Sequence, residues 1–195
     1  FITIIFIATG LLSLLPIQPV GQKLVIFIIL PILWLYTPIF KGIPIIGNVM
    51  IGATLGLVFL FTEAALTNQI SRLWFPAFLA FHLTFNRELI KDLQDMKGDR
   101  KNGIVTLPIW VGERGSIVIY IISSFLLLVW PVYFINHGAA GKTSLYLFSF
   151  GIIPALTLTV FYLIWRKEKS DYKLLSYILK VSTVIGMVVI FSITL

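Results

Sequence analysis

Long apolar runs separated by short charged segments dominate the chain. A helix needs about 20 apolar residues to cross the hydrocarbon core of a membrane, and charged residues mark where such runs end. Seven membrane-spanning helices are predicted, over residues 1–22, 24–40, 42–62, 73–86, 115–141, 143–165 and 174–195. The runs are continuously apolar rather than alternating, which favours helices over a β-barrel. The predicted fold class is an all-α, polytopic membrane helix bundle.

Two of these runs have notable ends. Pro16 and Pro19 are expected to end the first helix, and the short 73–86 run can lengthen into the polar segment that follows it. No internal repeat, linker or low-complexity tract divides the chain, so residues 1–195 are predicted to form a single domain. The chain opens at Phe1 inside an apolar run without a charged leader. We therefore expect further residues upstream of it.

The composition narrows the class of protein. Hydrophobic residues make up 58% of the chain and charged residues 12%, whereas a soluble domain carries roughly 25% charged residues. The absence of cysteine excludes disulfides and thiolate metal sites, and two histidines far apart disfavour a histidine metal site. Membrane lipid is the expected surrounding, and no nucleic-acid partner is expected.

The basic residues predict how the bundle lies in the membrane. One side of the predicted bundle receives three of them, Lys23, Arg72 and Lys142. The other side receives eleven: Lys41, Arg87, Lys91, Lys97, Arg100, Lys101, Arg114, Arg166, Lys167, Lys169 and Lys173. Because positive loops stay inside, the second side is predicted to face the cytoplasm, with the protein integral to the inner membrane. Lys180 lies within the last helix, where it is expected to snorkel towards the interface.

Half of the acidic residues lie in one short segment. Four of the eight are Glu88, Asp92, Asp95 and Asp99, at spacings of four, three and four, which places them on one face of a helix. Stacked carboxylates repel one another unless cations lie between them. Cations are interleaved here: Arg87, Lys91, Arg100 and Lys101.

This segment has the chemistry of a metal–diphosphate site. Carboxylate oxygens without histidine or cysteine suit Mg²⁺, which bridges carboxylates to substrate phosphates, and Arg and Lys hold further phosphate oxygens. The alternative is a solvated charged loop between membrane helices. The single acidic face, with Gly98 and Gly103 in place of a disordered polar run, favours the metal site.

Two motifs resemble a known family. The run Arg87-Glu88-x-x-Lys91-Asp92-x-x-Asp95-x-x-x-Asp99-x-x-x-Gly103-x-x-Thr106-Leu107-Pro108 resembles the second aspartate-rich motif of the UbiA superfamily of prenyltransferases. The run Tyr36-x-x-x-x-Lys41-x-x-Pro44-x-x-Gly47-Asn48 is similar to a segment of the digeranylgeranylglyceryl phosphate synthase branch. With the helix pattern, the resemblance covers essentially the whole chain.

The resemblance implies a bundle of nine helices around a central cavity, with Mg²⁺ bridging two aspartate-rich motifs to a prenyl diphosphate. By position, Asp95 and Asp99 are the implied catalytic carboxylates. The implied metal ligands are Asp92, Asp95 and Asp99, with Asp92 the weaker candidate. The candidate phosphate contacts are Lys41, Arg87, Lys91, Arg100 and Lys101. For these cations the alternative role is that of cytoplasmic topology markers.

The family's first motif, Asn-Asp-x-x-Asp-x-x-x-Asp, does not occur in the chain. In the family it lies between the second and third helices, so the seven predicted helices correspond to the third onwards. We expect this domain to be incomplete at its N-terminus. The chain alone would then supply half of the metal site and would be inactive without the other half.

The leading function is Mg²⁺-dependent transfer of a geranylgeranyl group to geranylgeranylglyceryl phosphate in ether-lipid synthesis. One alternative enzyme prenylates an aromatic ring for quinone, haem or chlorophyll synthesis. A different class is a transporter or a non-catalytic membrane subunit. Transporters usually place ionisable groups near the membrane midplane, whereas here the acids cluster at a helix end and only Lys180 and His82 lie within spans. His82 is expected to be a packing residue.

The predicted topology can be tested by labelling. The chain contains no cysteine, so single cysteines placed at Asn102 and Lys169 can be reacted with a membrane-impermeant thiol reagent. Both should react only from the cytoplasmic face, because the basic side is predicted to stay inside. Exclusive reaction of either one from the opposite face would reverse the predicted orientation.

Overall fold

The computed structural model describes residues 8–36, 38–40, 43–136, 146, 148–165 and 172–194. The named elements within these ranges are all helical. They are α2 (Pro19–Leu24), η1 (Val25–Ile29), α3 (Leu30–Tyr36), α4 (Ile46–Thr67), α5 (Trp74–Lys101), α6 (Leu107–Asn136), η3 (Phe148–Ile152), α8 (Ile153–Trp165) and α9 (Tyr172–Thr194). The predicted all-α fold class is confirmed.

Four segments of the described chain are long and apolar enough to cross a membrane. They are Pro19–Tyr36, Ile46–Thr67, Leu107–Val129 and Phe148–Trp165, and they correspond to the second, third, fifth and sixth predicted spans. α5 and α9 occupy the places of the fourth and seventh. The first predicted span, 1–22, contains a turn at residues 13–16, and α2 begins at Pro19, inside that span and before the predicted start of the second span at residue 24.

Several predictions fall on residues outside the described ranges. They concern residues 1–7 of the first span, the 137–145 and 166–171 connections, and the site candidate Lys41.

Two later boundaries were also predicted wrongly. The third span was expected to end before Glu63, but α4 continues to Thr67 and buries Glu63. The fifth was expected to begin after Arg114, but α6 begins at Leu107. Its first turn is separated from the rest at Gly112, whose φ of 79° is a conformation that glycine adopts without steric cost.

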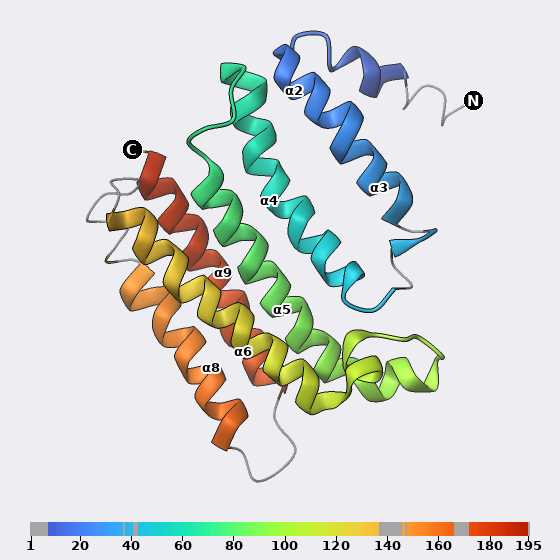
Figure 1. Ribbon diagram of the computed structural model, residues 1–195, viewed down its shortest axis with the longest axis vertical. Coiled ribbons are helices and arrows are strands. Elements are labelled where there is room, and N and C mark those ends of the chain that lie inside the picture. Colours follow the sequence, from blue (N-terminus) through green and yellow to red (C-terminus); the bar gives the residue numbers. More distant parts are fainter. Residues whose placement is uncertain are drawn as a thin grey trace.

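α5 lies in the middle of the bundle. It contacts α4, α6 and α9, while α8 packs on α6 and α9, and the α2–α3 segment packs on α4 (Figure 1). The starts of α4, α6 and α9 lie at the same end of the bundle as the last turns of α5 and α8, at the bottom of Figure 1. This alternation agrees with the predicted up-and-down topology.

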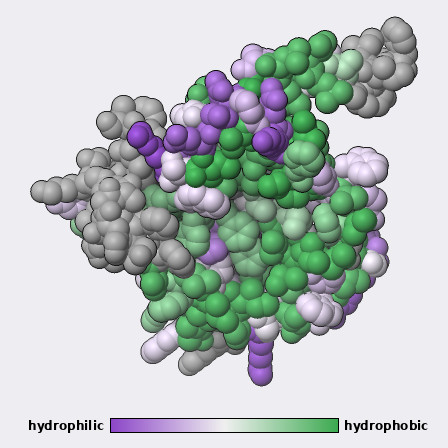
Figure 2. Space-filling model, turned by 45° about the horizontal axis from the view of Figure 1, so that its top comes forward, coloured by the Kyte–Doolittle hydropathy of each residue, from purple (hydrophilic) through white to green (hydrophobic). Residues whose placement is uncertain are grey.

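Hydrophobic side chains cover much of the outer surface. Figure 2 shows a face that is largely hydrophobic across its middle, with hydrophilic side chains gathered towards one end. Large apolar side chains such as Phe27, Phe125 and Leu158 are more than half exposed. Such a surface suits lipid rather than water, and the chain is an integral membrane protein.

Two wide helical turns have a common cause. The π-helical turns η1 and η3 end at Ile29 and Ile152, and a proline follows each of them two residues later, at Pro31 and Pro154. Proline lacks the N–H that an α-helix needs and its ring crowds the preceding turn, so the helix widens locally before it.

The helices α4 and α5 approach each other at backbone distance. A methyl group added at Gly52 would lie 3.0 Å from the carbonyl oxygen of Phe81, and one added at Gly56 would lie 2.9 Å from the carbonyl oxygen of Ala77. Small residues four apart are the usual way for membrane helices to pack this closely. The Gly52-x-x-x-Gly56 face therefore fixes the position of α5 relative to α4.

Glu63 stabilises the turn that joins these two helices. Its carboxylate accepts hydrogen bonds from the backbone N–H groups of Arg72 (2.7 Å) and Leu73 (3.0 Å) and from the hydroxyl of Ser71 (3.0 Å). The backbone donors at the start of α5 are thus satisfied by a side chain of α4. This explains why a buried acid is tolerated near the end of an apolar helix.

Alanine substitutions at two glycines should have opposite effects. Gly56→Ala should lower the free energy of unfolding by about 1–3 kcal/mol, because the new methyl group meets the Ala77 carbonyl. Gly98→Ala should raise it by roughly 0.5–1 kcal/mol, because Gly98 lies in α5 with open space around it. Unfolding of the purified protein in detergent measures both. Equal effects of the two substitutions would contradict the close α4–α5 contact.

Candidate active site

The four acidic residues predicted to share a face lie on the second half of α5. Glu88, Asp92, Asp95 and Asp99 follow one another along the helix as it leaves the apolar part of the bundle; we call them the carboxylate stripe. Glu88 is buried, Asp92 and Asp99 are half-buried, and Asp95 is exposed. The members of the stripe therefore have different surroundings and different chemistry.

Glu88 is neutralised by its own neighbours. Its carboxylate forms ion pairs with Arg87 at 2.8 Å and with Lys91 at 3.5 Å. Arg87 and Lys91 precede Glu88 and Asp92 by one residue, so they lie about 100° round the helix from the stripe. Glu88 thus holds two predicted phosphate contacts beside the acidic face.

Asp92 is held by a residue of α4. The side-chain amide of Asn48 donates a hydrogen bond of 2.8 Å to its carboxylate. Burial raises the pKa of the Asp92 carboxyl to about 6, although the hydrogen bond from Asn48 favours the charged form. This pKa includes the effect of the neighbouring negative charges of Glu88 and Asp99, which act in the same direction as burial. Asp92 is therefore the member of the stripe that most needs a compensating positive charge.

Asp95 and Asp99 are the uncompensated carboxylates. Neither forms a hydrogen bond or an ion pair with any residue that the structure describes. Burial raises the pKa of Asp99, and the negative charge of Asp95 acts in the same direction. Two repelling carboxylates one helical turn apart would gain from a cation shared between them.

The stripe does not form a closed metal cage. No group of three or more His, Cys, Asp or Glu side chains in the described part of the chain could hold a metal ion. Mg²⁺ is commonly bound through one or two carboxylates together with water and substrate phosphates. The oxygen-only donors Asp95 and Asp99, with Asp92 behind them, fit that open mode of binding.

A groove with four basic side chains runs beside the stripe, between α5 and α9. It encloses about 540 Å³, and we call it the cationic groove. Its lining residues are Arg87, Lys91, Gln94 and Asp95 of α5, and Lys173, Leu174, Ser176, Tyr177 and Lys180 of α9. Asp95 belongs to both the groove and the carboxylate stripe, so the acidic and basic surfaces adjoin at this residue.

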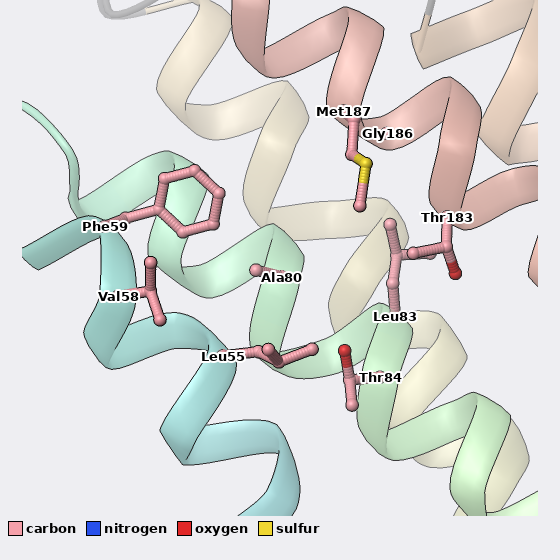
Figure 3. Close-up of a pocket in the computed structure, with 9 residues that line it drawn as sticks. All are labelled: Leu55, Val58, Phe59, Ala80, Leu83, Thr84, Thr183, Gly186 and Met187. Carbon is pink, nitrogen blue, oxygen red and sulfur yellow. The ribbon is translucent and has the colours of Figure 1, made fainter.

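An apolar pocket of about 210 Å³ lies further along the same helices. In Figure 3 its side chains converge from three helices: Leu55, Val58 and Phe59 of α4, Ala80, Leu83 and Thr84 of α5, and Thr183, Gly186 and Met187 of α9. Leu83 and Thr84 lie one turn before Arg87 and Glu88. Along α5 the lining thus changes from apolar to charged within a single turn.

The structure separates the remaining site candidates. Arg87 and Lys91 line the cationic groove, whereas Arg100 and Lys101 are exposed in the last turn of α5 and are not part of its lining. Lys41 lies outside the described residues. His82 is buried between the rings of Phe78 and Phe81, at centroid distances of 4.1 and 4.8 Å, in the manner of a packing residue.

The sequence analysis missed the contribution of α9 and of Asn48. Lys180 was expected only to snorkel and Lys173 only to mark topology, yet both line the cationic groove. The signal was present in their spacing, because Lys173, Ser176, Tyr177 and Lys180 recur at helical intervals in an otherwise apolar segment. Asn48 belonged to a recognised motif, but its contact with Asp92 is a tertiary one.

Comparison with known proteins decides the family. The model of the UbiA prenyltransferase family matches residues 1–184. The chain belongs to the UbiA prenyltransferase family. The family match covers the carboxylate stripe and the lining of the cationic groove, and it confirms the resemblance carried by the stripe.

Several curated relatives within the family are named digeranylgeranylglyceryl phosphate synthase. The one from Natronomonas pharaonis is 38% identical over 93 residues, which cover 48% of this chain and 33% of the relative. The one from Methanopyrus kandleri is 43% identical over 82 residues, covering 42% and 30%. The one from Sulfolobus acidocaldarius is 26% identical over 194 residues, covering 97% and 66%. The matches thus span between 30% and 66% of the length of these relatives.

A solved structure from work on digeranylgeranylglyceryl phosphate synthase in membranes has the same fold. Its TM-score is 0.78 at 24% sequence identity, and the match covers 100% of this chain and 69% of that one. The likeness establishes the helical arrangement of the family member described here.

Removing Asn48 should change the acidity of Asp92. In Asn48→Ala the pKa of Asp92 should rise above about 6, because the donor that favours the ionised carboxylate is lost. A larger fraction of Asp92 would then be protonated at neutral pH. Infrared titration of the carboxyl band, identified by its loss in Asp92→Asn, measures the shift.

The matched control for this measurement is Asn102→Ala. Asn102 is an exposed asparagine just beyond the end of the same helix, and its removal should leave the band unchanged. An Asp92 pKa that is the same in Asn48→Ala and the parent would show that the amide does not support the carboxylate.

Proposed function

We propose that the protein catalyses Mg²⁺-dependent transfer of a prenyl group from a prenyl diphosphate to a lipid acceptor, on the cytoplasmic side of the membrane. The observation that carries this proposal is the pair of uncompensated carboxylates, Asp95 and Asp99, beside a groove of basic side chains. The names of the curated relatives support a geranylgeranyl group as the prenyl chain and geranylgeranylglyceryl phosphate as the acceptor.

The roles of the residues follow from the chemistry of the reaction. The bond between the allylic carbon and the diphosphate oxygen breaks, the diphosphate leaves with the electron pair, and an acceptor hydroxyl forms the new C–O bond and loses its proton. Mg²⁺ held by Asp95 and Asp99, with Asp92 in support, would neutralise charge on the departing diphosphate. Arg87 and Lys91, oriented by Glu88, would bind further phosphate oxygens.

The apolar pocket has a second role in this proposal. An allylic carbon that is losing its leaving group reacts with water as readily as with an acceptor, so water must be kept away. The pocket of Leu83, Met187 and their neighbours lies within one turn of Arg87. It would hold hydrocarbon next to the phosphate contacts and exclude water from the reacting carbon.

The four cations of the groove also favour an anionic acceptor over an uncharged aromatic ring. For a transporter, ionisable groups would be expected near the midplane, whereas the ionisable groups of the described site lie towards the end of α5. An assay of radiolabelled product from prenyl diphosphate, with Mg²⁺ and then with EDTA, separates an enzyme from a transporter.

Each uncompensated carboxylate should be needed for turnover. In the full-length protein, Asp95→Asn and Asp99→Asn should each lower kcat by at least roughly 100-fold, the effect of losing one electrostatic stabiliser. Both positions lie at the outer end of α5, so helix content should remain that of the parent. Product formation at saturating Mg²⁺ is the measurement.

Glu113→Gln provides the matched control. Glu113 is a carboxylate near the start of α6, bound to the hydroxyl of Tyr172 rather than to the stripe, and an amide can still accept that bond. Its activity should be close to that of the parent. Near-normal activity in both aspartate variants would exclude the proposed metal site.

A further inference from the structure

Two polar stripes face each other across the cationic groove. On α9, Lys173, Ser176, Tyr177 and Lys180 are spaced by three, one and three residues, which places them on one face of the helix. On α5, Arg87, Lys91 and Gln94 do the same. An ionisable side chain within a membrane helix is costly and usually functional. Basic side chains that face one another across a groove would be stabilised by an anionic ligand bound between them.

The charges of the groove are not balanced by the residues that the structure describes. Its lining holds four cations and one carboxylate, Asp95. Glu88 outside it pairs with Arg87 and Lys91, but neither Lys173 nor Lys180 forms an ion pair with a described residue. Even with Glu88 counted, about two positive charges remain, which matches a phosphate monoester near neutral pH.

The ligand must also have a hydrocarbon part. Thr183 and Met187 of the apolar pocket follow Lys180 by three and seven residues on α9, and Leu83 precedes Arg87 by four on α5 (Figure 3). Because α5 and α9 run in opposite directions (Figure 1), the two sequences change from charged to apolar towards the same side. The cationic groove thus leads into the apolar pocket, as an anionic lipid requires.

The cationic groove is longer than one anionic group. On α5 it extends from Asp95, which it shares with the metal site, to Arg87, eight residues or about 12 Å away at 1.5 Å per residue, which is longer than a diphosphate. A diphosphate bound through Mg²⁺ at Asp95 and Asp99 therefore leaves the deeper end of the groove, at Lys180, for a second anion.

We propose that Lys173 and Lys180 bind the phosphate monoester of the acceptor lipid, whose hydrocarbon chain enters the apolar pocket, while the donor diphosphate is held at Asp95 and Asp99. This inference rests on the proposed function and adds to it the site of the second substrate. The lysines are binding residues of the acceptor rather than contacts of the leaving group.

The test separates the two substrates. In the full-length protein in liposomes, Lys180→Gln and Lys173→Gln should each raise the KM for geranylgeranylglyceryl phosphate at least about tenfold, the effect of one lost charge-assisted hydrogen bond. The KM for geranylgeranyl diphosphate should stay within about twofold of the parent, because in this inference the two lysines do not contact the donor. Lys180→Arg should restore much of the loss, and Lys23→Gln, an exposed lysine of α2, should have no effect.

An acceptor without a phosphate group identifies the contact. Geranylgeranylglycerol should be a poor acceptor for the parent, and Lys180→Gln should reduce its use no further, because the interaction is already absent. A raised KM for the donor instead of the acceptor would overturn the inference. Inorganic phosphate should compete with the acceptor more weakly than a lipid phosphate does. Equally strong competition would show that the apolar pocket does not bind the hydrocarbon chain of the acceptor.

Binding without turnover distinguishes this inference from the proposed function. Equilibrium binding of radiolabelled geranylgeranylglyceryl phosphate to the purified protein, without donor or Mg²⁺, should weaken at least about tenfold in each lysine variant. If binding depends on the lysines but the protein has no transfer activity, the proposed function would be refuted and lipid-phosphate binding in the cationic groove would be supported. If the protein has transfer activity and both variants bind the acceptor as the parent does, the proposed function would be supported and acceptor binding by the two lysines would be refuted.

Discussion

The contact between the backbones of α4 and α5 is the constraint on which the site depends. Gly52 and Gly56 leave no room for a side chain between the two helices, so α5 cannot rotate or slide without a clash. Asn48 lies one turn before Gly52 on the same face of α4, and this register brings its amide to Asp92. At the other end of the pair, Glu63 fixes the turn that precedes α5 by accepting hydrogen bonds from the backbone N–H groups of Arg72 and Leu73.

The rigid position of α5 keeps opposite charges apart. Among the described residues, Asp95 and Asp99 of α5 form no ion pair, and neither do Lys173 and Lys180 of α9, although Asp95 lines the same groove as the two lysines. In a flexible charged loop such groups would find one another, because ion pairing in partly buried surroundings is favourable. Segregated charges of both signs within a few helical turns are expected where ligands, rather than side chains, complete the pairing.

The sequence predicted what periodicity can predict. Continuous apolar runs gave most of the helices, and the spacing from Glu88 to Asp99 gave the carboxylate stripe, because the helical period decides which residues share a face. Periodicity does not decide which helices pack against each other, so neither the role of Lys180 nor the partner of Asp92 could be predicted from it. The end of α4 was misplaced because the charge of Glu63 is satisfied by backbone donors ten residues further on, which composition alone does not reveal.

The boundary between apolar and charged lining determines where a substrate can react. Along α5 that boundary falls between Thr84 and Arg87, and along α9 it falls between Lys180 and Thr183. In a prenyl diphosphate the bond to be broken joins hydrocarbon to phosphate, so an amphiphile bound with each part in its preferred surroundings would place that bond near the boundary. The nucleophilic oxygen of a lipid phosphate also lies between its phosphate and its hydrocarbon chain. Two amphiphiles with their head groups towards the same end would therefore lie side by side, and orientation of this kind contributes a large part of catalysis.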